Sequence, residues 1–108
     1  GESFLAIAQS QMKPNGVYIF DEPEAALSPQ RQLTLLLAIH NYLKSGAQFI
    51  IATHSPILLG IPEAEILSLD GGYIHPISYE EADCFQVMEM FINNREVMLK
   101  RLLSDDNG

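Results

Sequence analysis

Acidic and polar residues able to act on a phosphate group follow two apolar, β-prone runs of this chain. Asp21 and Glu22 come directly after the run at 17–20, and His54 lies two residues beyond the run at 49–52. In open α/β sheets, ligands bind outside the carboxyl ends of the strands. We therefore expect these polar residues to meet at one edge of a sheet, within reach of one ligand.

The residue types allow a catalytic and a purely structural interpretation. One carboxylate of the pair Asp21-Glu22 can hold Mg²⁺, mostly through water because this ion dehydrates reluctantly, while the other orients and polarises an attacking water. Taken alone, acidic residues before Pro23 are more typical of a turn. His54 can donate a hydrogen bond to a terminal phosphate oxygen, or it can be an exposed residue at the end of a strand. Both interpretations stay open at this level.

The elements that must position these residues are predicted by hydrophobic pattern and punctuation. The two runs are continuously apolar, which is typical of strands covered on both faces in a parallel sheet. Between them, Ser28 is placed to cap a helix that begins with Pro29, runs to about Lys44 and stops at Gly46. A strand, a helix and a strand at this spacing form a βαβ unit with parallel strands.

Further elements flank this unit on both sides. A helix is predicted over 4–12, and a third strand over 66–69 precedes a glycine turn. Ser78 and Glu81 match a capping box for a following helix, and Asn94 is placed to cap a last one. The Met and Phe residues of these helices are expected to form core or a face left bare by a missing part of the domain: Phe85, Met88, Met90, Phe91 and Met98.

The composition excludes several classes of protein. The 6 basic and 14 acidic residues give a net charge of −8, which repels a nucleic-acid backbone, so this segment is not expected to be a nucleic-acid surface. Nucleic acid stays open as a partner of the full-length protein through other segments. A single cysteine, Cys84, allows no internal disulfide and fits a reducing compartment. No apolar run reaches the ~20 residues that span a bilayer. We expect a cytoplasmic protein without a membrane partner, whose start at Gly1 is compatible with a trimmed sequence.

The order of the motifs is more specific than any one of them. The segments VYIFDEP at 17–23, ALSP at 26–29 and IATHSP at 51–56 resemble the ABC-type ATPase family. The resemblance implies an α/β fold: part of a three-layer, P-loop NTPase-like domain, with a mostly parallel sheet and flanking helices, lacking the N-terminal Walker A portion. Residues 1–108 would be the C-terminal part of one such domain. Glu24 and Ser28 replace the threonine and aspartate usual in transport ATPases, which is more similar to stand-alone ATPases of DNA repair, phage defence or translation.

The same resemblance implies a role for each matching residue. The run at 17–21 corresponds to the Walker B strand, with Asp21 near Mg²⁺. Glu22 corresponds to the catalytic carboxylate that positions the hydrolytic water, and His54 to the switch histidine that senses the γ-phosphate. The implied nucleotide-contacting positions are Gly1 and Glu2 at the end of the signature motif, and Ser28 in the D-loop. In the family, the signature motif begins a helix whose N-terminus faces the nucleotide, and the D-loop crosses to a partner subunit.

One motif of the family is absent from these 108 residues. No Gly-x-x-x-x-Gly-Lys-Ser/Thr loop occurs, and this loop supplies the backbone N–H cradle and the lysine for the phosphates. The resemblance therefore implies ATP and Mg²⁺ as cofactors of a longer ATPase, with the missing N-terminal half of the domain as one partner and an ATP-sandwich homodimer as the assembly. This segment alone is expected to be inactive. The alternatives are the ATP-binding subunit of a membrane transporter and a degenerate, non-enzymatic interaction domain.

Overall fold

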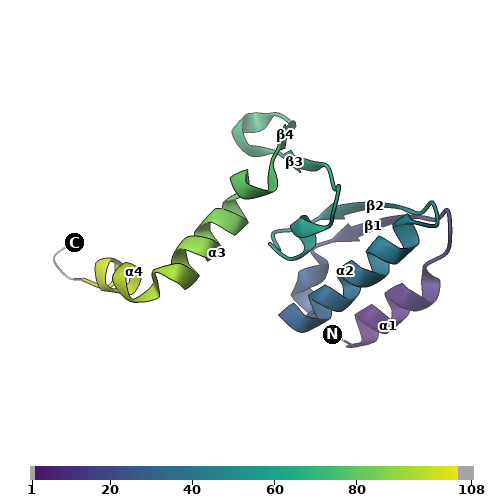
Figure 1. Ribbon diagram of the computed structural model, residues 1–108, viewed down its shortest axis with the longest axis horizontal. Helices are drawn as coiled ribbons and strands as arrows, with labels where there is room; N and C mark the ends of the chain where they lie inside the picture. The colour runs from purple at the N-terminus through teal and green to yellow at the C-terminus, as the bar shows by residue number, and fades with distance from the viewer. Residues whose placement is uncertain (1, 105–108) are drawn as a thin grey trace. The chain divides into compact units, whose positions relative to one another are not determined.

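A computed structural model describes residues 2–104 of the chain, with the backbone alone at positions 2 and 3. The chain forms two compact units, and the division between them falls after Glu65. Figure 1 shows the elements of each unit. Among residues 2–104, no helix is both long and apolar enough to cross a membrane.

Unit 1 contains the predicted βαβ arrangement. Its strands pair in parallel, with Val17 opposite Gln48 and Asp21 opposite Ala52. The prediction of two parallel strands joined by a helix is therefore confirmed. The helices and strands of the unit are α1 (Glu2–Gln11), β1 (Val17–Asp21), α2 (Pro29–Leu43) and β2 (Gln48–Ala52).

Helix α2 begins and ends where local chemistry dictates. The Ser28 hydroxyl accepts a hydrogen bond from the Arg31 backbone N–H at 3.2 Å, and Pro29 occupies the first helical turn, where no intrahelical donor is needed. At the other end, Gly46 has a φ of 91°, a left-handed conformation that glycine adopts without steric cost. Its N–H donates to the Leu43 carbonyl at 3.1 Å. Both predicted signals are confirmed.

The core of unit 1 lies between the two helices and one face of the strand pair. The rings of Phe4 in α1 and Phe20 in β1 meet edge to face with centroids 5.9 Å apart. Leu35 and Ile39 of α2 are 0% and 1% exposed. The strand residues that pack against this core alternate with outward-facing ones, as a pleated strand requires: Tyr18, Phe20, Phe49 and Ile51.

The opposite face of the same strand pair is apolar and bare. Val17, Ile19 and Ile50 are 63%, 74% and 54% exposed. The prediction that both faces are covered does not hold within unit 1, because α1 and α2 lie on the same side of the strand pair (Figure 1). Unit 1 as described therefore has two layers, one of helices and one of strands.

Unit 2 joins a short antiparallel strand pair to two helices. Ile66 of β3 pairs with Ile77 of β4, and Ser68 pairs with His75. The strand predicted over 66–69 is thus confirmed, one residue shorter than expected. The elements of the unit are β3 (Ile66–Ser68), β4 (His75–Ile77), α3 (Asp83–Asn93) and α4 (Arg95–Leu102).

The two predicted caps in unit 2 had different outcomes. The Ser78 N–H donates to the Glu81 carboxylate at 2.8 Å, and the reciprocal bond to the Ser78 side chain is also present. This capping box encloses a short 3₁₀ turn, and α3 begins only at Asp83. Asn94 does occupy the predicted N-cap position of α4, but its side chain makes no capping bond there, because its Nδ2 donates backwards to the Met90 carbonyl at 3.0 Å.

Candidate functional site

The register of the parallel strands brings the two polar strand ends together. Asp21 lies opposite Ala52, so His54 follows at the same edge of the sheet. The Glu22 N–H donates to the Ala52 carbonyl at 2.7 Å and extends the pairing by one residue. The side chains of Asp21, Glu22 and His54 are all exposed. The prediction that these residues meet at one sheet edge is confirmed, whereas their catalytic roles stay predictions.

Glu22 adopts a backbone conformation that is rare for its residue type. Its φ and ψ are 48° and 54°, in the left-handed region, which costs a residue other than glycine roughly 1–2 kcal/mol. Pro23 is buried directly after it and begins a 3₁₀ turn, and the Ala25 N–H donates to the Glu22 carbonyl at 3.1 Å. Asp21 is thus the last residue of β1, Glu22 leads into the turn that follows it, and both are exposed at this end of the strand.

The carboxylates of Asp21 and Glu22 are chemically suited to hold a divalent ion through water. Within residues 2–104, no cluster of three or more potential ligands is present. Mg²⁺ needs no such cluster, because it is commonly bound by one or two carboxylates together with water and substrate phosphates. The exposed pair fits that donor set.

A third acidic residue connects the two strand ends. The Glu24 carboxylate accepts a hydrogen bond from the Thr53 hydroxyl at 2.6 Å through one oxygen and from the His54 backbone N–H at 2.8 Å through the other. Partial burial is the largest influence and acts to raise the pKa of Glu24. The bonds from Thr53 and His54, together with its own backbone N–H and the electrostatic effect of His54, outweigh burial and hold the pKa below its ordinary value. Glu24 is therefore ionised at neutral pH.

A buried polar pair anchors the segment on the other side of His54. The Ser55 hydroxyl donates to the Gln32 side-chain oxygen, and both residues are buried. The same hydroxyl accepts from the Leu58 N–H at 3.2 Å, and Gln32 Nε2 donates to the Leu27 carbonyl at 3.2 Å. Each of these buried polar groups has a partner, as groups withdrawn from water require.

The predicted nucleotide-contacting residues are less well defined. Ser28 lies at the start of α2, where its hydroxyl is engaged as the helix cap. Gly1 lies outside the described residues, and so does the side chain of Glu2, whose backbone begins α1. A contact of any of the three with a nucleotide stays a prediction.

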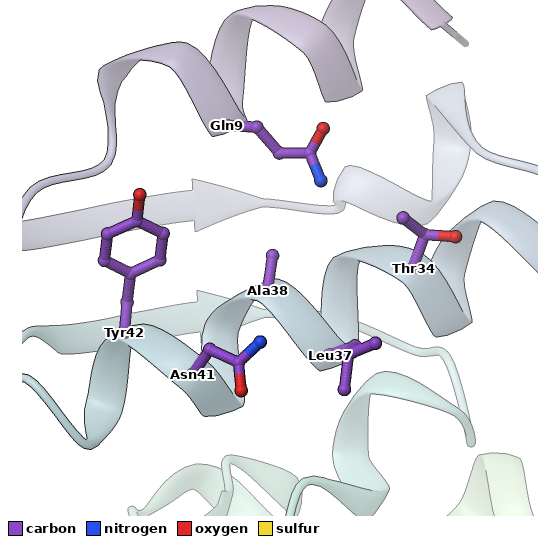
Figure 2. A pocket seen from close by; sticks show the side chains of 6 residues that line it. All are labelled: Gln9, Thr34, Leu37, Ala38, Asn41 and Tyr42. Atoms are coloured by element: carbon purple, nitrogen blue, oxygen red, sulfur yellow. The ribbon is translucent and has the colours of Figure 1, made fainter.

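A pocket of about 280 Å³ opens between α1 and α2, away from these residues. Figure 2 shows Gln9 of α1 pointing toward α2 across it. None of Asp21, Glu22 and His54 lines this pocket, so the sheet-edge site is an exposed rim and is separate from it. The lining residues are Gln9, Thr34, Leu37, Ala38, Asn41 and Tyr42.

Sequence reasoning missed the residues that hold the site together. Glu24 was singled out only as a replacement for threonine, and Thr53 only as part of the polar strand end. The available signal was the strand register, since Asp21 opposite Ala52 places Thr53 beside the turn that contains Glu24. The buried contact of Gln32 with Ser55 has no comparable local signal.

Comparisons with known proteins place the chain in a family and identify several similar curated proteins. The family described as "AAA domain, putative AbiEii toxin, Type IV TA system" matches residues 3–60, more than half of the chain. Similar curated proteins include the ribose import ATP-binding protein RbsA of Bacillus cereus, 29% identical over 84% of this chain and 19% of its own length. The cytochrome c biogenesis ATP-binding export protein CcmA of Bartonella henselae is 36% identical over 61% of this chain and 31% of its own length.

A third relative is also an ATP-binding protein, and this chain again covers only part of its length. The hemin import ATP-binding protein HmuV of Pseudomonas aeruginosa is 32% identical over 64% of this chain and 27% of its own length. The chain thus spans between about a fifth and a third of the length of these curated relatives. The family model matches more than half of the chain, and the acidic pair lies at the end of a parallel strand. The chain therefore belongs to this AAA family and is a P-loop ATPase-type domain of the ABC/AAA kind.

Proposed function

We propose that this chain is the C-terminal part, residues 1–108, of an ATP-binding and ATP-hydrolysing domain in a longer protein. The observation that carries the proposal is the shared sheet edge, where the register of β1 and β2 brings Asp21 and Glu22 beside the segment that carries His54. The family match and the ATP-binding relatives support the same reaction.

Each residue of the edge then has one task in the hydrolysis of ATP. Asp21 would hold Mg²⁺, which when bound would supply positive charge to neutralise the phosphates. The Glu22 carboxylate accepts a hydrogen bond from the attacking water and aims its oxygen at the γ-phosphorus, and the bond from that phosphorus to the bridging oxygen breaks as ADP leaves. A ring N–H of His54 donates to a γ-phosphate oxygen and reports that the phosphate is present.

The missing N-terminal half of the domain is the first partner that we propose. The bare face of the strand pair supports it, because Val17, Ile19 and Ile50 expose apolar surface there. Covering such a side chain fully contributes about 1.5–3 kcal/mol.

A second partner is another copy of the protein in an ATP-sandwich dimer, in which Gly1, Glu2 and Ser28 contact the nucleotide; this proposal rests on the family resemblance. The net charge of −8 argues against nucleic acid as a partner of this segment.

A transporter subunit is the second candidate function. Two relatives are import ATP-binding proteins and one is an export protein, which favours this role. Glu24 and Ser28 stand against it, since transport ATPases usually carry threonine and aspartate at these places. Co-purification of the longer protein with a membrane-embedded subunit supports the transporter role, and turnover by the longer protein alone, unaffected by membranes, argues against it.

The first experiment separates binding from hydrolysis. Isothermal titration of the 108-residue chain with Mg-ATP is expected to show no micromolar binding, because the chain has no phosphate-binding loop. In the longer protein that supplies this loop, Glu22→Gln should abolish turnover and leave ATP binding intact, with Glu65→Gln, an exposed glutamate of the same unit, as the matched control. Equal turnover in Glu22→Gln removes Glu22 from the catalytic role, and absence of turnover in the wild type favours a non-enzymatic interaction domain.

A further inference from the structure

We propose that Glu24 is a positioning residue of the sheet-edge site. It binds the Thr53 hydroxyl and the His54 backbone N–H, and so fixes the His54 backbone at the edge where the acidic pair lies. The proposal rests on the hydrolytic function proposed above, and it assigns the part that Glu24 takes in it.

The first step is the geometry of the Glu24 carboxylate. Each of its two oxygens accepts one hydrogen bond, from the Thr53 hydroxyl at 2.6 Å and from the His54 N–H at 2.8 Å. Glu24 belongs to the 3₁₀ turn Pro23–Ala26, directly after the acidic pair. One side chain therefore links the turn that follows β1 to the segment that follows β2.

The second step is that strand pairing does not reach His54. The paired register of β2 ends at Ala52, whose carbonyl accepts from the Glu22 N–H. The His54 N–H lies beyond that ladder and donates to Glu24 instead. Hydrogen bonds to an ionised acceptor are shorter and roughly twice as strong as neutral ones, so Glu24 restrains the backbone at the position where the sheet no longer does.

The third step is that the His54 backbone is held from both sides while its ring stays accessible. Glu24 holds the residue itself and Thr53 before it, and the buried contact with Gln32 holds Ser55 after it. The His54 side chain is exposed. A ring that contacts the γ-phosphate most strongly in the transition state loses less conformational freedom there when its backbone is already fixed. This preorganisation is the role that we assign to Glu24.

The hydrogen bonds that Glu24 accepts from Thr53 and His54 are called the Glu24 clamp below, and their chemistry suggests a graded set of variants. Glu24→Ala removes both acceptors. Glu24→Gln keeps one acceptor for the His54 N–H, and its amide can donate to the Thr53 hydroxyl, which accepts as well as donates. Thr53→Val keeps the shape but removes two bonds, the one that the hydroxyl donates to Glu24 and the one that it accepts from the Ser55 N–H at 3.0 Å. Thr53→Ser keeps the hydroxyl. Rescue by Glu24→Gln and by Thr53→Ser is therefore expected if hydrogen bonding to this segment matters.

The first measurement needs no enzymatic activity. Solvent exchange of the His54 amide proton, followed by NMR in the 108-residue chain, is expected to rise about tenfold in Glu24→Ala, since a bond to a charged acceptor is lost. The increase should be small in Glu24→Gln and absent in Glu65→Ala. An unchanged exchange rate in both Glu24→Ala and Thr53→Val overturns the clamp.

The second measurement is steady-state hydrolysis by the longer protein that supplies the phosphate-binding loop. Glu24→Ala should lower kcat about tenfold with KM for ATP changed less than twofold, and Glu24→Gln should restore most of kcat. A structural defect would instead reduce the active fraction in proportion to unfolding, which the thermal melting of each variant reports. Wild-type turnover with unchanged kcat in Glu24→Ala overturns the positioning role alone. A wild type without turnover overturns the proposed function, and the positioning role with it.

Discussion

The two units use similar apolar sequences in different ways. In unit 1, α2 buries Leu35 and Ile39 almost completely against one face of the strand pair. In unit 2, α3 and α4 contain no buried residue, and Met88 and Met90 of α3 are about half exposed. The apolar patterns of α2 and α3 both predict a helix that is amphipathic or buried. Burial depends on whether another element lies opposite the apolar stripe, and sequence periodicity alone does not report that.

The C-terminal helices lie between the two expectations of a core and a bare face. No residue of α3 or α4 is buried, yet Phe85, Phe91 and Met98 are half-buried. Ile92, in contrast, is 66% exposed. The outer face of β1 and β2 is exposed too, so unit 1 has one covered and one uncovered face.

The largest expected effect tests this contrast between the units. Leu35→Ala should lower the free energy of unfolding by about 2–5 kcal/mol, because it leaves a cavity in a packed core. Met88→Ala on the exposed side of α3 should change it by no more than about 0.5 kcal/mol. Urea unfolding followed by circular dichroism measures both. A comparable loss in the two variants would show that α3 is packed as tightly as α2.

The buried polar anchor beside His54 should have the next largest effect. Ser55→Ala removes the donor to the Gln32 oxygen and leaves a buried acceptor without a partner, which costs about 1–3 kcal/mol. Ser10→Ala is the matched control, because its hydroxyl donates to the Ile7 carbonyl on the exposed surface of α1. The same urea titration applies. Equal stability of the two variants would mean that the anchor contributes nothing beyond a surface hydrogen bond.

The bare face of the sheet should tolerate polar substitution in this chain. Ile19→Ser is expected to change the free energy of unfolding by no more than about 0.5 kcal/mol, because Ile19 is already 74% exposed. Phe20→Ala, one residue along the same strand but on the covered face, should cost several times more. A loss of about 2 kcal/mol or more in Ile19→Ser would show that this face is covered in solution.

The smallest expected effect is the pH dependence of the Glu24 clamp. Its pKa is lowered in the folded chain, so its contribution to stability is fully present above the ordinary glutamate pKa of about 4.3 and is lost as the pH falls through the lower, folded value. Glu24 is only partly buried, and the remaining solvent screening keeps the contribution small. The stability difference between wild type and Glu24→Ala should shrink below about pH 4. A difference that grows toward acid pH would contradict this sign.

Much of unit 1 could be predicted because its signals are local. The cap at Ser28 and the stop at Gly46 depend on residues within one helical turn. The two apolar runs have the length and β-propensity of strands, and the helix between them makes parallel pairing the expected topology. The edge that unites Asp21, Glu22 and His54 follows directly from that topology. Where a local signal had a competing partner the prediction held only in part: Asn94 is the N-cap residue of α4, but its side-chain amide donates to Met90 instead of capping the helix.

The sequence by itself determined the order of the elements, their parallel pairing and the edge at which the acidic pair and His54 meet. The tertiary structure alone decided which face of the strands is covered, because an apolar side chain has no preference between a neighbour in its own chain and another apolar surface. It also decided how His54 is held. The bonds of Glu24 to Thr53 and His54 join residues 29 and 30 positions apart, and their directional geometry exists only after the strands have paired.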